Sequence, residues 1–231
     1  MNILVIGAAG GIGTSLVNQL NDLSANLFLG YHQNKIDTNH PHQQVDARNF
    51  ESTESFVQKG LDELGSVDGV VNLAGNLILK PAHLSTDEDF SVSIETNLKT
   101  AFSVVKAVGN NLKDCSVVLM STAAASIGLA NHELISSAKS GVEGLAISAA
   151  KTYARKNIRF NTVSPGLVDT PLAEKITSNE LALNASKKMH GLQRIGRPDD
   201  IAGIISYLVN PDNNWITGQN FVIDGGLSSI K

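Results

Sequence analysis

A glycine-rich turn follows directly after a short apolar run at the beginning of the chain. Residues 3–6 are aliphatic, the turn reads Gly7-Ala-Ala-Gly-Gly11-Ile12-Gly13, and a helix-length segment continues to residue 23. Glycines here let the backbone approach a pyrophosphate closely, and the first turn of the helix offers free N–H groups to anionic oxygens. The order strand, turn, helix predicts the start of a βαβ unit that binds a dinucleotide. A purely structural tight turn is the alternative.

Short apolar runs alternate with helix-length segments along the chain of 231 residues. Continuous hydrophobicity is typical of strands that are covered on both faces, so the pattern predicts a parallel sheet with helices on each side. The predicted strands are residues 3–6, 27–29, 70–73, 117–120, 158–163 and 220–223. The predicted helices are residues 13–23, 52–64, 87–110, 136–153 and 198–209. We expect one α/β domain over residues 1–231, because this length fits a single core.

Composition excludes several classes of function. The net charge is −4 and no basic stripe is present, which argues against a nucleic-acid partner. Cys115 is the only cysteine, so no internal disulfide or cysteine-rich metal site is expected. Residues 31–44 are polar and predict a loop, and the histidines in it lack the further ligands that a metal site needs. The apolar opening is too short for a signal peptide or a membrane span, so we expect a cytoplasmic protein without a membrane partner.

The motifs of the chain resemble those of the short-chain dehydrogenase/reductase family. Gly-x-x-x-Gly-x-Gly is that family's version of the glycine turn, and the other similarities follow it in the family's order. They are Asp46 after the third strand, Asn72-Leu-Ala-Gly75, Asn97-Leu-Lys-Thr100, Ser121-Thr122, Lys139, Asn161-Thr-Val-Ser-Pro165-Gly166, Gly196-Arg-Pro and Ile223-Asp-Gly-Gly226. The resemblance implies a Rossmann fold with a doubly wound parallel sheet of about seven strands. Two departures, Ile6 and Leu73, replace polar residues of the family on strands expected to be neighbours, which suggests an apolar packing exchange.

The resemblance also implies an NAD(P) cofactor. The residues that would contact it are Gly7, Gly11, Ile12, Gly13, Asp46, Asn72, Ala74, Gly75, Lys139, Pro165, Gly166, Val168 and Thr170. In NAD-binding proteins of this fold, an aspartate at the end of the second strand accepts a hydrogen bond from the adenosine ribose and repels a 2′-phosphate. No carboxylate stands there, and His32 or Lys35 can face a 2′-phosphate instead. The sequence therefore favours NADP over NAD, although the glycine turn contains no basic residue.

The catalytic motif of the family, Tyr-x-x-x-Lys, is incomplete in this chain. Lys139 is present, but the position four residues before it is Ile135, which has no ionisable proton. Thr122 occupies the position of the family's serine and retains a hydroxyl, and Asn97 matches the asparagine that supports a proton-relay water. The resemblance therefore implies hydride transfer to or from a carbonyl, alcohol or enone substrate at an altered centre.

Several alternatives for the missing tyrosine stay open. His132 lies seven residues before Lys139, on the same face if the helix includes both, and imidazole titrates near neutrality. A histidine facing solvent at the helix start is the competing interpretation. Thr122 with a water held by Lys139 can relay a proton more slowly, and activated substrates need less help at oxygen. The rival hypothesis is an inactive NAD(P)-binding protein with a sensing or scaffolding role.

Two further segments suggest substrate binding and self-association. Residues 171–195 follow the Pro-Gly turn where the family places its substrate lid, and they combine apolar side chains with Lys187, Lys188, His190 and Arg194. This mixture suits an apolar substrate with an anionic tail, or simply an amphipathic surface helix. Residues 138–150 are rich in Gly, Ala and Ser, and the equivalent helix of the family forms dimer contacts. The resemblance implies a homodimer or homotetramer.

Overall fold

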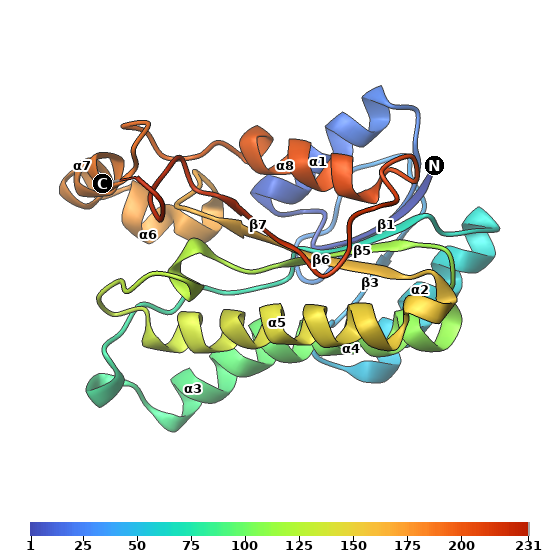
Figure 1. Cartoon of the computed structure of the whole chain (residues 1–231), viewed down its shortest axis with the longest axis horizontal. Helices are drawn as coiled ribbons and strands as arrows, with labels where there is room; N and C mark the ends of the chain where they lie inside the picture. Colours follow the sequence, from blue (N-terminus) through green and yellow to red (C-terminus); the bar gives the residue numbers. More distant parts are fainter. Residues whose placement is uncertain (231) are drawn as a thin grey trace.

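The computed structural model describes residues 1–230 and forms a seven-stranded sheet between two layers of helices (Figure 1). All neighbouring strands are parallel. Their order across the sheet is β3 (His42–Gln44), β2 (Asn26–Tyr31), β1 (Asn2–Ile6), β4 (Gly69–Asn72), β5 (Ser116–Met120), β6 (Arg159–Pro165) and β7 (Asn220–Ile223). The predicted doubly wound fold class is confirmed.

Helices cover both faces of the sheet. Figure 1 shows α1 (Gly11–Asp22) and α8 (Pro198–Val209) on one face, with α4 (Thr100–Asn111) and α5 (Glu133–Thr152) on the other. The helix α2 (Phe50–Leu64) packs against α4, and α3 (Asp87–Ile94) against α5. No helix among residues 1–230 is long and apolar enough to cross a membrane.

Two hydrophobic cores explain why the strands have continuous rather than alternating hydrophobicity. Along β1, Leu4 and Ile6 enter the core beneath α2, α4 and α5, whereas Ile3 and Val5 enter the core beneath α1 and α8. Successive strand residues point to opposite faces, so a strand that is covered on both faces, such as β1, carries apolar residues at successive positions.

The hypothesis of an apolar exchange between Ile6 and Leu73 is corrected by this arrangement. The strands β1 and β4 are neighbours, and the Leu73 N–H donates to the Ile6 carbonyl at 2.9 Å. However, Ile6 belongs to the core beneath α4 and α5, while Leu73 packs against the core beneath α1 and α8. The two side chains lie on opposite faces of the sheet, so each fits its own core.

Three segments differ in detail from the predicted elements. The predicted helix 87–110 is α3, a π-helical turn at Glu95–Lys99, and α4. The predicted loop 31–44 contains no helix, but its end pairs with β2 as the short edge strand β3. That strand has the sequence His-Gln-Gln and is only partly covered, so it has no apolar signal. Residues 171–195 contain α6 (Glu174–Thr177) and α7 (Glu180–Met189).

Candidate active site

A single cavity of about 560 Å³ lies at the carboxyl ends of the central strands. One end is bounded by the glycine turn after β1 and the loops after β2 and β3, and the other by residues of β5, α5 and the segment after β6. The carboxyl ends of strands at a topological switch point form the usual ligand crevice of an open parallel sheet. Most of the residues implied as cofactor contacts line this cavity: Gly7, Gly11, Ile12, Gly13, His32, Asp46, Ala74, Gly75, Lys139, Pro165, Gly166, Val168 and Thr170.

The glycine turn is packed so tightly that side chains are excluded. Gly7 has a positive φ of 84°, and its N–H donates to the Gly30 carbonyl at 3.0 Å. A Cβ at Gly13 would overlap the Gly7 carbonyl oxygen and lie 2.8 Å from the Ala8 backbone, and one at Gly11 would lie 2.9 Å from Thr170 Cγ2. Because Gly10 gives α1 no side-chain cap, the first N–H groups of the helix are free to receive an anionic ligand.

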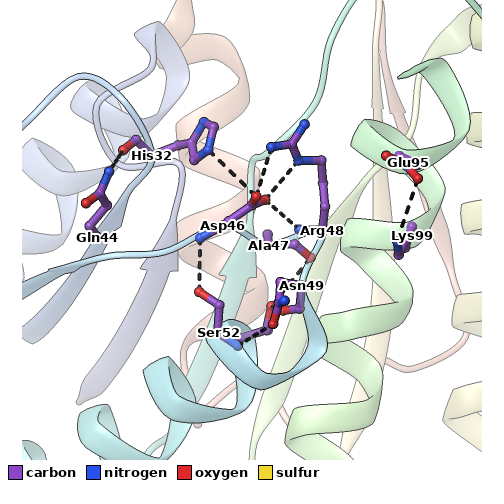
Figure 2. Close-up of polar contacts among 10 residues, drawn as sticks. His32, Gln44, Asp46, Ala47, Arg48, Asn49, Ser52, Glu95 and Lys99 are labelled. Atoms are coloured by element: carbon purple, nitrogen blue, oxygen red, sulfur yellow. Dashed lines mark hydrogen bonds and ion pairs between the residues drawn. The ribbon is translucent and has the colours of Figure 1, made fainter. Parts of the chain in front are cut away.

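An ion pair forms the far wall of the cavity beyond β2 and β3. Figure 2 shows Arg48 and His32 directed toward Asp46 from two sides. Arg48 Nε and Nη2 donate to the two carboxylate oxygens at 2.9 and 2.8 Å, and His32 Nε2 lies 4.0 Å from Oδ2. The side-chain hydrogen bonds from Arg48 lower the pKa of Asp46 to about 2. Arg48 was not identified from the sequence, although a cation two residues after Asp46 was a visible signal.

Two residues expected to contact the cofactor do not line the cavity. Asn72 is buried, its Oδ1 accepts the Ala74 N–H at 3.2 Å, and its Nδ2 donates to Thr100 Oγ1 at 3.4 Å. The Asn72 side chain therefore shapes the turn after β4 rather than a ligand surface. Lys35 lies in the polar loop outside the cavity lining. This leaves His32 as the predicted basic residue at this end.

The other loop histidines are occupied by local contacts. His40 Nε2 lies 2.8 Å from Asn21 Oδ1, and His42 Nδ1 lies 2.9 Å from the His40 carbonyl oxygen. Over residues 1–230, no three side chains of His, Cys, Asp or Glu gather as potential metal ligands.

Lys139 lies at the opposite end of the cavity from Asp46. Its side chain is buried, and Nζ donates to the Met120 carbonyl oxygen at 2.9 Å. Burial lowers the pKa of the Lys139 ammonium to about 8. A Cβ placed at Gly75 would lie 2.9 Å from Asn97 Oδ1 and 3.4 Å from Lys139 Nζ. The absence of a side chain at Gly75 therefore allows the Asn97 amide and the Lys139 amine to lie close together.

Asn97 is held by the π-helical turn between α3 and α4. Its Oδ1 accepts the Asn76 N–H at 3.2 Å, and its Nδ2 donates to Asn76 Oδ1 at 2.6 Å and to the Ser93 carbonyl at 3.0 Å. Such turns widen a helix by one residue and are frequent at functional sites. Asn76 lines the cavity and was not identified from the sequence, since its partner is 21 positions away.

Thr122 and Ile135 complete this end. Thr122 follows β5, and its Oγ1 accepts the Ala124 N–H at 3.4 Å, which leaves the hydroxyl proton available to a ligand. Ile135 is 4% exposed and lines the cavity one helical turn before Lys139. Within the described chain, the one tyrosine of the cavity lining is Tyr31, at the Asp46 end. Near Lys139 the lining thus offers a hydroxyl, amides and an amine, but no phenol.

The expectation that His132 replaces the tyrosine is not supported by its position. Helix α5 begins at Glu133, so His132 precedes it, and the spacing of a regular helix does not apply to its side chain. Its Nδ1 lies 2.8 Å from the Ala130 carbonyl oxygen, and the residue does not line the cavity. Glu133 is exposed and likewise lies outside the lining.

The match to known families agrees with this geometry. Residues 7–228 match the family model described as enoyl-(acyl carrier protein) reductase. The chain belongs to the short-chain dehydrogenase/reductase family. Its members are oxidoreductases, and the match extends over nearly the whole chain.

Curated and solved relatives of this short-chain dehydrogenase/reductase cover most of its length. A tropinone reductase homolog of Arabidopsis thaliana is 29% identical over 99% of this chain and 93% of its own. The 3-oxoacyl-[acyl-carrier-protein] reductase FabG of Thermotoga maritima is 34% identical over 74% of this chain and 70% of its own. The solved aldohexose dehydrogenase of Thermoplasma acidophilum is 26% identical, with a TM-score of 0.90 over 98% of this chain and 94% of that one. ElxO, solved with NADP bound, is 27% identical, with a TM-score of 0.90 over 99% and 98%.

The basic residues of the segment 171–195 do not line the cavity of this short-chain dehydrogenase/reductase, and Lys187 and Lys188 lie outside it on α7. His190 is 3% exposed; its Nδ1 lies 2.6 Å from the Ser186 carbonyl oxygen, and its Nε2 accepts the Leu167 N–H at 3.3 Å. Arg194 pairs with Asp200 at 2.6 and 3.0 Å. The residues of this segment that line the cavity are all apolar: Pro171, Leu172 and Ala173.

Proposed function

We propose that this chain is an NADP(H)-dependent oxidoreductase that reduces carbonyl or enone substrates or oxidises the matching alcohols. The observation that carries the proposal is the single cavity that joins the glycine turn to Thr122, Lys139 and Asn97. A ligand that binds the free N–H groups of α1 with its phosphates can therefore extend to a buried amine and a hydroxyl. A dinucleotide has this length and charge distribution.

The chain's own residues fit such a ligand at both ends. The glycines of the turn admit the pyrophosphate, and Lys139, Gly166 and Thr170 line the part of the cavity expected to hold the nicotinamide half. The nicotinamide, when bound, supplies or accepts the hydride. Among the chain's residues, Thr122 holds the substrate oxygen by its hydroxyl, and Lys139 gives or takes the proton, directly or through a water.

The choice of NADP rests on the charges around Asp46. The loop after β2 reads Tyr31-His-Gln-Asn34 and contributes no carboxylate to the cavity. The Asp46 carboxylate is already paired with Arg48, so its repulsion of a 2′-phosphate is partly cancelled. Arg48 and His32 are the cationic or protonatable groups at this end, and arginine binds phosphate in two-point geometry. The solved relative ElxO with NADP supports this choice.

The altered centre restricts the substrates that suit it. Without a phenol at position 135, proton transfer depends on the amine of Lys139, whose pKa of about 8 lets it act near neutral pH. Ile135, Leu167 and Leu172 present an apolar wall. We therefore expect activated carbonyls, such as α-dicarbonyls and quinones, or enones, to react faster than simple ketones.

The deciding experiment is an absorbance assay of NADPH and NADH oxidation with a panel of carbonyl, imine and enone substrates. The expected result is turnover with NADPH that falls at least about tenfold in Lys139→Ala, since general acid catalysis contributes about 10²- to 10⁴-fold. Titration of each nucleotide by calorimetry gives affinity independently of turnover. Turnover equal in the wild type and in Lys139→Ala would refute the proposed centre.

A nucleotide-binding protein without turnover is the second candidate. The observation that favours it is Ile135, a buried aliphatic side chain beside Lys139, together with the engagement of Nζ by the Met120 carbonyl. In that case Lys139 contributes only to nucleotide binding. Tight NADPH binding with no oxidation by any substrate of the panel supports this candidate and excludes the enzymatic one.

Self-association and the lid belong to the same proposal. We place the contact between subunits on α5, where Ile147 is 60% exposed among small residues such as Ser140 and Gly144. Residues 171–195 form the lid over the substrate, with Leu172 facing the cavity. Light scattering after size exclusion tests the first point: Ile147→Lys is expected to shift a dimer or tetramer toward monomer.

A further inference from the structure

The orientation of two side-chain amides near Lys139 is fixed by a backbone contact. The Asn76 N–H donates to the Asn97 side chain at 3.2 Å, so the accepting atom of Asn97 is its oxygen. The other atom of that amide, Nδ2, donates to the Asn76 side chain at 2.6 Å, which makes the contacted atom of Asn76 its oxygen. The hydrogen-bond pattern alone therefore assigns the oxygen and nitrogen of both side-chain amides.

It follows that, of the two side-chain amides, the Asn76 NH₂ is the group that donates to neither amide. It makes no hydrogen bond to any residue between 1 and 230. The group is also accessible. Among residues 1–230, the buried side-chain nitrogen and oxygen atoms without a hydrogen-bond partner are Gln43 Oε1 and Ser93 Oγ, and Asn76 Nδ2 is not one of them. Since Asn76 lines the cavity, its NH₂ is an accessible donor.

The surroundings place this donor close to the proposed reaction centre. Asn76 follows Gly75, where an added Cβ would lie 2.9 Å from Asn97 Oδ1 and 3.4 Å from Lys139 Nζ. The same part of the cavity has an aliphatic side chain, Ile135, where the family has its phenol. A neutral, oriented N–H donor in such a partly apolar site stabilises charge that develops on an oxygen.

We propose that Asn76 is a substrate-contacting residue whose NH₂ binds the reacting oxygen of a carbonyl substrate; this inference rests on the proposed oxidoreductase function. Hydride adds to the carbonyl carbon, and the C=O π electron pair moves to oxygen. That oxygen takes a proton from the Lys139 ammonium, which becomes the neutral amine, while Asn76 keeps both of its N–H protons. Asn76 thus supplies the hydrogen bond of the missing phenol, and Lys139 supplies the proton.

The alternative is that Asn76 only orients Asn97, and two substitutions separate the roles. Asn76→Asp keeps an oxygen for Asn97 Nδ2 and the backbone N–H for Asn97 Oδ1, but it removes the NH₂ donor. Asn76→Ala removes the oxygen as well. If the NH₂ binds substrate, both variants lose kcat for NADPH-dependent reduction of 9,10-phenanthrenequinone by at least about tenfold, since one such donor is worth about 10²- to 10³-fold in enclosed sites. If Asn76 is only a support, Asp keeps the wild-type kcat and Ala alone loses it, which overturns the proposal.

Separate controls test whether the added charge or a loss of folding accounts for a lower kcat. Asn18→Asp adds the same charge on the exposed face of α1, outside the cavity lining, and should keep the wild-type kcat. The pH profile of kcat reveals any rise in the Lys139 pKa caused by the new carboxylate, because the profile then moves to higher pH instead of falling uniformly. Thermal melting and NADPH affinity should stay unchanged in all three variants.

A measurement without turnover distinguishes failure of this inference from failure of the proposed function. In ¹⁵N-labelled protein saturated with NADP⁺, the NH₂ signals of Asn76, assigned by their loss in Asn76→Asp, should shift when phenanthrenequinone is added. If the wild type never oxidises NADPH but the signals shift, the oxidoreductase function fails and the contact stands. Unmoved signals in a protein that does reduce the quinone would exclude Asn76 as a substrate ligand.

Discussion

The two ends of the cavity hold their charges in opposite ways. At one end Asp46 and Arg48 form a two-point ion pair, and each side chain remains more than one-third exposed. At the other end Lys139 is buried and donates to a backbone carbonyl, with neutral amides and a hydroxyl around it. The first end has a carboxylate with a lowered pKa, and the second has an ammonium with a lowered pKa.

The difference shows what controls each group. The hydrogen bonds from Arg48 stabilise the charged form of Asp46, whereas desolvation destabilises the charged form of Lys139. An exposed ion pair contributes little to folding and is available for exchange with a ligand. A buried ammonium lowers the stability of the fold but is suited to proton transfer near neutral pH. We therefore expect changes at the first end to alter nucleotide choice and changes at the second to alter turnover and stability.

Restoring the phenol should give the largest effect. Ile135→Tyr places an acid one helical turn before Lys139, in a position that already lines the cavity. The expected result is a gain of at least about tenfold in kcat for carbonyl reduction, toward the 10²- to 10⁴-fold that a general acid supplies. The NADPH oxidation assay measures it, with Ile135→Phe as the control of equal shape and no hydroxyl. An equal gain in the Phe variant, or none in the Tyr variant, contradicts the expectation.

Adding a methyl group to the glycine turn should give the second-largest effect, a loss of nucleotide affinity. In Gly13→Ala the added Cβ overlaps the Gly7 carbonyl oxygen and approaches the Ala8 backbone, neither of which is a flexible side chain. Overpacking of this kind costs about 1–3 kcal/mol, and we expect about a 10- to 100-fold loss of NADPH affinity by calorimetry. Gly65→Ala, where a Cβ has open space but φ is 74°, controls for a general loss of stability. Equal affinity of Gly13→Ala and the wild type would mean that the turn does not hold the phosphates.

Removing the buried cation should stabilise the fold in a pH-dependent manner. The folded-state pKa of Lys139, about 8, lies below the value near 10.5 of an exposed lysine. Below pH 8 both states bind the proton, so the cost of burying the charge is fully present. Between the two pKa values the unfolded state binds more protons, and the stability of the wild type rises with pH. We expect Lys139→Met to be more stable at about pH 7 by on the order of 1–3 kcal/mol.

Thermal or urea unfolding of the apo protein at two pH values measures this difference. The advantage of Lys139→Met should shrink when the pH is raised from about 7 to about 10, because the wild type then no longer buries a charge. A difference that is independent of pH, or a less stable variant at neutral pH, would show that the ammonium is solvated or otherwise compensated in the folded protein.

The smallest effect is expected at the ion pair. Arg48→Gln removes the guanidinium but can still hydrogen-bond Asp46, so we expect about a 3- to 10-fold loss of NADPH affinity with little change for NADH. Asp46→Asn should act in the opposite direction, because it frees Arg48 and removes the like charge near the phosphate. Competition titrations of the two nucleotides give both ratios. Parallel changes for NADPH and NADH in Arg48→Gln would place Arg48 away from the 2′-phosphate.

Local patterns in the sequence predicted most of the fold. Strands β1, β2 and β5 carried continuous apolar runs because both of their faces are covered, whereas β6 also buries Arg159, Asn161 and Thr162. The glycine turn was recognisable because its φ and packing admit no side chain. The edge strand β3 was expected only from the family resemblance and not from an apolar run, since its partly covered His-Gln-Gln needs no apolar residue. The boundary between α3 and α4 was also missed, because a π-helical turn leaves the helical periodicity nearly intact.

The site was less predictable because several of its contacts join distant residues. Lys139, Thr122 and Asn97 were found through their motifs, and the structure brings them to one cavity. Asn76 and Arg48 were missed, as their significance depends on what they contact. The helical spacing that favoured His132 does not hold, because this residue lies before the helix, and the Asn72 side chain turns back to the Ala74 N–H instead of lining the cavity.

The π-helical turn at Glu95–Lys99 ties the position of Asn97 to chain length as well as to composition. The turn stores one residue more than an α-helix requires. Deleting a single residue there would remove that extra residue and return the segment to α-helical winding, so α3 and α4 would keep their relative orientation. The side chains of the turn would move by one position, and the Asn97 amide would lose its contacts with Asn76. We therefore expect such a deletion to preserve the packing of α3 against α5 but to displace the amide beside Lys139.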